Sequence, residues 1–203
     1  TKQTPMMAQY HRLKSDLPEG TVLLFRLGDF YEMFFDDANV CAEILNITLT
    51  QRGATPMCGI PHHAAENYIG KLLAAGRKVA MCEQTEEAVP GKLVNREVTQ
   101  ILSPGTHFDE KMLTAERNNF LAALSREGKA FGLAVIDLTT GDFKATEMAD
   151  TAALQAELER LKPSEIVHPA GDSNLVAAIA GSRAVVNEHE GWVFASDSAG
   201  YTL

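Results

Sequence analysis

Phe30 and Glu32 are the residues whose types and spacing have the clearest chemical meaning. They follow an apolar run at 21–27 and a Gly-Asp pair, a pattern that predicts two short strands joined by a tight turn. Because side chains alternate along a strand, Phe30 and Glu32 then share one face with Phe34. An aromatic ring beside a carboxylate is suited to a flat polar ring such as a nucleobase. Alternatively, Phe30 and Phe34 pack into a core with Glu32 at its rim, and spacing alone leaves both interpretations open.

Cys58, His62 and His63, together with Cys82 in a predicted strand nearby, have side chains that can bind a metal or act as nucleophiles. Their spacing lacks the paired Cys-x-x-Cys or His-x-x-x-His arrangement of structural zinc sites, so we expect no metal. A nucleophilic Cys and His pair needs an orienting acid and an oxyanion loop, and neither is identifiable. The sequence therefore predicts a binding protein rather than an enzyme.

The amino-acid sequence around Phe30 and Glu32 resembles the N-terminal part of the MutS family of DNA mismatch-recognition proteins. The resemblance rests on five stretches: 25–37, 50–53, 56–61, 79–85 and 101–106. It extends more loosely to about residue 203. It implies that Phe30 wedges into the minor groove beside a mispaired base and that Glu32 hydrogen-bonds that base. A carboxylate that faces a base acceptor must carry a proton, so we expect a raised pKa for Glu32 in the complex.

The segment 56–63 is rich in Pro and Gly, which predicts an irregular loop before a helix. Backbone amides at a helix N-terminus can seat a phosphate, although a purely structural turn is the alternative. The resemblance favours contacts with the DNA backbone here and nearby, and the candidate residues are Arg52, Met57, His62, Lys92 and Arg96. The sequence departs from many family members at 53–56, which is short, and at His62, where Tyr is common. Both departures affect the contacts of this loop.

The charge of the chain argues against general binding of polyanions. The 203 residues carry a formal net charge of −9. Residues 1–115 hold 11 Lys and Arg against 14 Asp and Glu, and the remainder hold 7 against 13. Non-specific DNA binding depends on basic residues that release counterions. We therefore expect a few placed contacts with DNA, with the bulk of the affinity supplied by another part of a larger molecule or by a partner subunit.

The first predicted domain, residues 1–113, is α/β with a mixed sheet flanked by helices. Thr4 and Pro5 predict a helix start, and Asp36 or Asp37 is expected to cap a second helix. We predict strands at 47–50, 79–84 and 97–102, and a turn at 51–53. A further helix is expected to follow the loop at 56–63 and to end at Gly76.

The second predicted domain, residues 114–203, begins with a three-stranded meander at 120–125, 132–138 and 142–148. Helices and strands then alternate, which is the order of ribonuclease H-like folds. In MutS proteins a connector domain of that fold occupies this position, and we expect this one to be incomplete.

The ribonuclease H-like order raises a nuclease hypothesis. Asp137 ends a predicted strand, where nucleases of this architecture hold a metal-binding carboxylate, and Glu165 is the only other acid at such a position. Two-metal hydrolysis requires several converging carboxylates. We therefore expect Asp137 to serve a turn with Thr139 and Thr140 instead.

The resemblance also implies partners and cofactors. We expect recognition of mismatched or unpaired bases in duplex DNA, a second MutS-type subunit and a MutL-type protein. No Gly-x-x-x-x-Gly-Lys-Ser/Thr loop occurs in the sequence, so ATP and Mg²⁺ are expected only in an ATPase domain outside it. The alternative is a protein-interaction module whose connector docks a MutL-type partner, without DNA binding by this segment alone.

The location expected from the sequence is the cytoplasm, in association with the nucleoid if the source is bacterial. The N-terminal residues lack the pattern of a signal peptide, and no apolar run approaches a membrane span. Three cysteines, Cys41, Cys58 and Cys82, cannot all pair with one another, so we expect reduced thiols. No membrane partner is expected.

Overall fold

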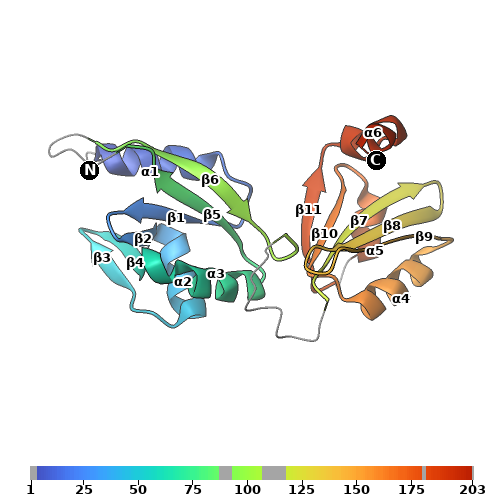
Figure 1. Cartoon of the computed structure of the whole chain (residues 1–203), viewed down its shortest axis with the longest axis horizontal. Helices are drawn as coiled ribbons and strands as arrows, with labels where there is room; N and C mark the ends of the chain where they lie inside the picture. The colour runs from blue at the N-terminus through green and yellow to red at the C-terminus, as the bar shows by residue number, and fades with distance from the viewer. Residues whose placement is uncertain (1–3, 87–92, 107–117, 180–181, 203) are drawn as a thin grey trace. The chain divides into compact units, whose positions relative to one another are not determined.

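The computed structural model describes residues 4–86, 93–106, 118–179 and 182–202. The chain divides into two compact units, Thr1–Ser103 and Pro104–Leu203 (Figure 1). The domain boundary predicted between residues 113 and 114 lies outside the described residues and stays a prediction. Pro104 and Gly105, the first residues of the second unit, bond within that unit: the Gly105 amide donates to Glu165, and the Asn119 side-chain amide donates to the Pro104 carbonyl.

The first unit is built on a six-stranded mixed sheet in the order β3-β4-β2-β1-β5-β6. Only the pair β1 and β5 is parallel among these neighbours, and the other described pairs are antiparallel. The elements are α1 Pro5–Ser15, β1 Thr21–Leu27, β2 Phe30–Phe34, α2 Phe35–Leu45, β3 Thr50–Arg52, β4 Thr55–Pro61, the 3-10 turn η1 His62–Ala64, α3 Ala65–Ala74, β5 Lys78–Gln84 and β6 Arg96–Leu102. The α/β class predicted from the sequence is therefore confirmed.

Helices cover both faces of this sheet, with α1 on one side and α2 and α3 on the other (Figure 1). Alternation along β1 sends Leu23 and Phe25 toward Tyr10 of α1, and sends Val22 and Leu24 into the core beneath α2 and α3. Successive residues of β1 are therefore apolar, as expected of a strand whose two faces are both covered by helices. Thr4 caps α1 as predicted, since its hydroxyl accepts a hydrogen bond from the Met7 amide at 3.3 Å.

Three local predictions in the first unit were wrong. The segment expected to be an irregular loop is the inner strand β4, in which the two prolines lie at or near the strand ends, where a missing N–H disturbs the ladder least. The strand expected at 47–50 begins at Thr50, and the turn moves to Gly53 and Ala54 because β3 pairs with β4 through Arg52 and Thr55. Helix α2 begins at Phe35 without a side-chain cap, so neither Asp36 nor Asp37 has the expected role.

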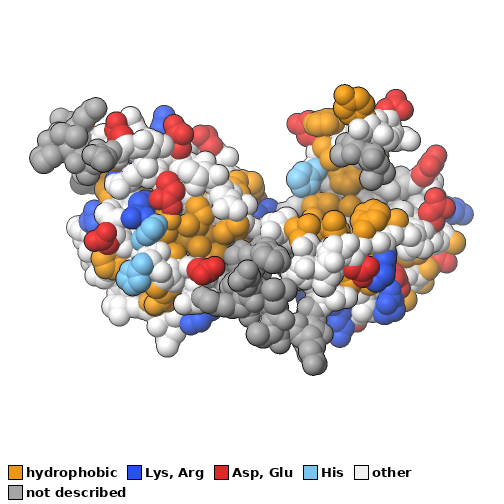
Figure 2. Space-filling model, viewed as in Figure 1, with side chains coloured by type: hydrophobic (Ala, Val, Ile, Leu, Met, Phe, Trp, Pro, Cys, Tyr) orange, Lys and Arg blue, Asp and Glu red, His pale blue; other side chains and the backbone are white. Residues whose placement is uncertain are grey.

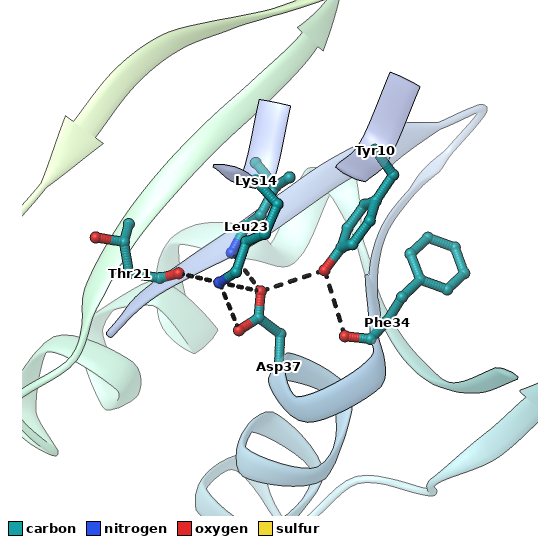
Figure 3. A network of polar contacts seen from close by, with 6 residues as sticks. All are labelled: Tyr10, Lys14, Thr21, Leu23, Phe34 and Asp37. Atoms are coloured by element: carbon teal, nitrogen blue, oxygen red, sulfur yellow. Dashed lines mark hydrogen bonds and ion pairs between the residues drawn. The ribbon is translucent and has the colours of Figure 1, made fainter. Parts of the chain in front are cut away.

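Asp37 instead joins α1, α2 and β1 in a buried polar network (Figure 3). Its carboxylate accepts hydrogen bonds from Lys14 Nζ at 2.8 Å, from the Leu23 amide at 3.0 Å and from the Tyr10 hydroxyl at 3.3 Å. Lys14 also donates to the Thr21 carbonyl. Burial, together with the Asp37 charge, raises the pKa of the Tyr10 phenol. This network fixes α1 over the face of the sheet that carries Phe30 and Glu32.

Replacement of Asp37 by alanine should lower the free energy of unfolding by about 2–3 kcal/mol, because it leaves Lys14 and the Leu23 amide without their partner. The matched control is Asp36→Ala, which removes an exposed carboxylate from the preceding residue and should have an effect within about 0.5 kcal/mol. Urea unfolding followed by circular dichroism measures both. Equal losses in the two variants would contradict the assigned role of Asp37.

The second unit has a five-stranded mixed sheet in the order β11-β10-β7-β8-β9. Its elements are β7 Phe120–Glu127, β8 Ala130–Asp137, β9 Asp142–Met148, α4 Thr151–Leu161, β10 Glu165–Pro169, α5 Ser173–Ile179, β11 Val185–His189, the 3-10 turn η3 Gly191–Phe194 and α6 Ser196–Thr202. Antiparallel β7, β8 and β9 are followed by β10 and β11, which run parallel to β7. This is the predicted ribonuclease H-like order, and α4 and α5 pack on one face through Leu154, Leu158 and Leu175.

Candidate nucleic-acid interface

The hairpin of β1 and β2 positions Phe30 and Glu32. Gly28 adopts φ 59°, a conformation that glycine enters without strain, and the two-residue turn sets Leu27 opposite Phe30. The same register sets Phe25 opposite Glu32. Directly paired residues share a face, so Phe30 and Glu32 lie on the side of the sheet that α1 covers. The predicted hairpin and the predicted shared face are both present.

Phe30 is 48% exposed, although it lies on the same face as two fully buried phenylalanines. Tyr10 of α1 covers Phe25 and Phe34, with ring centroids 5.6 and 5.2 Å apart. Phe30 lies at the turn end of β2, beside Leu27 and Pro61. The packed interpretation therefore holds for Phe34 and does not hold for Phe30, whose ring is open to solvent.

Glu32 is only 9% exposed, and its carboxylate has one charged partner. Arg52 Nη2 donates to Glu32 Oε1 at 2.8 Å, whereas Oε2 is buried and has no hydrogen-bond partner among the described residues. Burial raises the pKa of Glu32, and the Arg52 charge opposes that rise. A hydrogen bond from Glu32 to a base acceptor also requires a raised pKa. The pKa of Glu32 is therefore shifted in that direction already in the DNA-free protein.

The other candidate contacts are divided between the two faces of the sheet. Arg52 and Met57 share the face of Phe30 and Glu32, because Met57 pairs with Phe34 and contacts the cluster beneath α1. His62 packs instead against Tyr31, with ring centroids 5.3 Å apart, and Tyr31 belongs to the core on the opposite face. Lys92 lies outside the described residues, so its role stays a prediction.

Arg96 does not fit its expected contact with the DNA backbone. Its side chain is 4% exposed and lies 4.9 Å above the Phe25 ring. Its Nη1 donates to Gln9 Oε1 at 3.1 Å and to the Val94 carbonyl at 2.8 Å, and its Nε donates to the Arg26 carbonyl at 2.7 Å. A guanidinium held by four groups of the domain acts as a structural cation.

The phosphate seat that is one of the two interpretations of the segment before α3 stays a prediction. The preceding segment is the strand β4, and η1 separates it from the helix. Ala64 precedes the first residue of α3 and supplies no side-chain cap. The candidate residues that the structure brings together lie at the β1 and β2 turn and at Arg52, which ends β3.

Cys58, His62, His63 and Cys82 form no metal site: in the part of the chain that the structure describes, no group of three His, Cys, Asp or Glu residues is arranged to hold a metal ion. Cys58 is buried and its thiol donates to the Ala38 carbonyl at 3.4 Å. Burial raises the pKa of this thiol to about 11, which makes it a poor nucleophile at neutral pH. Its environment is that of a core residue.

The two acids of the nuclease hypothesis serve the fold. Asp137 is fully buried, and its carboxylate accepts from the amide and hydroxyl of Thr139, at 2.9 and 2.6 Å, and from the Asn119 amide at 3.2 Å. These hydrogen bonds lower its pKa although burial opposes them. Glu165 accepts from the Gly105 amide and from the Asn187 side chain. The predicted turn role of Asp137 is confirmed.

On the face shown in Figure 2, acidic and basic side chains are interspersed, and the basic ones do not gather into a patch. This distribution agrees with the net charge of −9 and with recognition through a few contacts. Among the helices that the structure describes, none is long and apolar enough to span a bilayer.

Comparison with known proteins gives matches along most of the chain. The profile of MutS domain I matches residues 4–111, and that of MutS domain II matches residues 119–203. The DNA mismatch repair protein MutS of Solibacter usitatus (strain Ellin6076) is 44% identical over 208 aligned positions, which cover 98% of this chain and 24% of that protein. The solved Pelota protein of Thermoplasma acidophilum aligns over 89% of this chain and 68% of its own, at 13% identity and a TM-score of 0.28, too low to carry an argument.

These matches establish how much of a MutS protein the chain represents and which of its domains. It spans about a quarter of the length of the curated relative, and its two units correspond to two consecutive domains. The matched domains agree with the predicted order of a mismatch-recognition domain followed by a connector domain. The chain therefore belongs to the MutS family of mismatch repair proteins.

Proposed function

We propose that this chain recognises mispaired or unpaired bases in duplex DNA, with Phe30 as the wedge and Glu32 as the base contact. The observation that carries the proposal is the contrast between two neighbours on one face of the sheet. Phe30 is 48% exposed, and Glu32 keeps a buried carboxylate oxygen that has no hydrogen-bond partner among the described residues. An exposed ring at a turn can enter a base step, and an unsatisfied oxygen gains energy when a ligand satisfies it.

The mechanism is readout of deformability followed by one polar contact. A mispaired step is less stably stacked than a matched one, so less free energy is needed to unstack and bend it. Phe30 exploits that difference when it enters the step from the minor groove. Glu32, in its protonated form, donates to an acceptor on the displaced base. Burial already favours this protonated form by raising the pKa.

The test compares binding of a G·T duplex and of a matched duplex by the full-length protein that carries this segment. Glu32→Ala should lower the ratio of the two affinities about tenfold, the equivalent of one hydrogen bond of about 1.4 kcal/mol. Glu43→Ala is the matched control, since it removes an exposed carboxylate from α2 on the opposite face. An unchanged ratio in the Glu32 variant would contradict the proposed base contact.

The same proposal makes mismatch selectivity depend on pH. A carboxyl with a raised pKa is protonated at low pH and loses its proton only above the ordinary value of 4.5. The selectivity of the unaltered protein should therefore decline as the pH rises through that higher value. Glu32→Gln keeps a permanent donor, so its selectivity should be flat over the same range. Parallel pH profiles in the two proteins would contradict this role for the proton.

The remaining family features are proposals about the whole protein. They comprise a second MutS-type subunit that helps to enclose the duplex, a MutL-type partner for the connector, and ATP with Mg²⁺ in a domain beyond this segment. We place the activity in the cytoplasm.

One observation favours a partner on the connector: a groove between α4 and the edge strand β9 has a volume of about 470 Å³ and is lined by Leu133, Lys144, Met148 and Arg160. Edge strands and apolar grooves are common sites of peptide docking.

A further inference from the structure

The ion pair between Glu32 and Arg52 satisfies only one of the two carboxylate oxygens of Glu32. Arg52 ends β3, the edge strand of the first sheet, and binds Oε1 at 2.8 Å. Glu32 Oε2 is shielded from solvent and has no donor among the described residues. A buried carboxylate oxygen without a donor is destabilising by about 1–3 kcal/mol. In the free protein, Glu32 Oε2 can therefore accept or share a hydrogen bond with a new partner at a gain in free energy.

The two members of this pair differ in their access to the surroundings. The Arg52 side chain is 46% exposed, whereas the Glu32 side chain is 12% exposed. Only Nη2 of Arg52 bonds to Glu32, while Nη1 lies 3.8 Å from Met6 Sδ, and the guanidinium carbon lies 5.9 Å from the centre of the Phe34 ring. A thioether and a ring are weak partners for a cation with five N–H donors. Arg52 can thus reach an anion outside the domain, and a phosphate matches its planar fork.

We infer that Arg52 exchanges partners when the duplex binds: its guanidinium leaves the Glu32 carboxylate for a phosphodiester of the DNA backbone. The released Glu32 takes up a proton from the solvent, keeps it, and donates a hydrogen bond to the mispaired base. The inference rests on the proposed function. It makes Arg52 the residue that couples backbone binding to base recognition.

Electrostatics around Glu32 gives this exchange its direction. The groups that face Glu32 are Phe25 from β1, Gly59 from β4 and Arg52 from β3, and Arg52 is the one described charge that acts on its pKa. Burial favours the neutral carboxyl and Arg52 favours the carboxylate. Once a phosphate has taken Arg52, burial acts unopposed and the carboxyl takes up a proton. Backbone contact and proton uptake therefore occur together.

The first experiment uses the free chain and no DNA. The Glu32 side-chain carboxyl is followed by carbon-detected NMR through a pH titration. Arg52→Gln should move the Glu32 titration to higher pH, because the opposing cation is gone. Arg12→Gln is the matched control: it removes a cation from an exposed position on α1, almost two helical turns from Met6, and should leave the titration in place. An unchanged Glu32 titration in Arg52→Gln would overturn the inference.

The second experiment measures binding by the full-length protein as a function of salt and pH. Loss of one phosphate contact in Arg52→Gln should reduce the slope of log affinity against log salt by about 0.9, on matched and mismatched duplexes alike. The uptake of protons on mismatch binding should also fall, because Glu32 is already more protonated in the free variant. Arg52→Lys keeps the charge and should retain most of the salt slope.

The outcomes separate this inference from the proposed function. A static ion pair predicts an unchanged salt slope in Arg52→Gln, and that result would overturn the exchange even if mismatch selectivity is present. If the unaltered protein shows no mismatch selectivity, the proposed function fails. The titration of the free chain and the salt slope on a matched duplex then still decide whether Arg52 changes partners.

Discussion

Replacement of Phe30 by alanine in the full-length protein should lower the preference for a mismatched over a matched duplex by about 10- to 100-fold, because stacking of one base on an aromatic ring contributes about 1–3 kcal/mol. Binding to a matched duplex should change little, since the ring makes few phosphate contacts. This is the largest effect expected of a single side chain in the segment. Fluorescence anisotropy with labelled G·T and matched duplexes measures both affinities.

The exposure of Phe30 allows this experiment to separate DNA recognition from folding. Half of the ring is already in solvent, so its removal should change the free energy of unfolding by less than about 1 kcal/mol, and the variant should remain folded. Phe143→Ala is the matched control, because Phe143 is a 59% exposed ring on β9 of the other unit. Equal loss of affinity for matched and mismatched duplexes in Phe30→Ala would show that the ring supports general binding rather than recognition.

The features that the sequence predicts well are local ones. The turn at Gly28 and the start of α1 at Thr4 and Pro5 depend on residues within a few positions of one another. The shared face of Phe30 and Glu32 needs only the alternation of a strand. Resemblance to a family then gives these two residues a meaning that spacing cannot supply, because an aromatic and an acid two residues apart are compatible with a core as well as with a binding site.

The features that the sequence does not predict depend on pairing between distant segments. Pro56 and Gly59 disfavour a strand locally, yet β4 forms because β2 and β3 both pair with it. Pairing of β3 with β4 carries Arg52 to Glu32, 20 positions away in the chain. In the same way, Arg96 becomes buried because β6 lies beside β5 and beneath α1. The side chains of Arg52 and Arg96 are chemically alike, and only their register distinguishes an exchangeable cation from a structural one.

The 203-residue chain alone should bind a G·T duplex with an affinity at least 100-fold weaker than the full-length protein does near 150 mM salt, even though it carries Phe30 and Glu32. Its net charge of −9 allows little release of counterions, which supplies most of the affinity of proteins for DNA. One wedge and one base contact must also offset the bending of the duplex, which costs about 1–6 kcal/mol, and the entropy lost on association.

This expectation follows from the described surface as well as from the total charge. Arg96 is enclosed by the first unit, so the exposed guanidinium at the interface is that of Arg52, and the proposed exchange makes one phosphate contact with it. A titration of the purified chain against a labelled G·T duplex tests the expectation, with a matched duplex and the full-length protein as controls. Submicromolar, mismatch-selective binding by the chain alone would show that the first unit needs no second subunit to bend and hold DNA, and that its few contacts contribute more than single hydrogen bonds and one stacked ring ordinarily do.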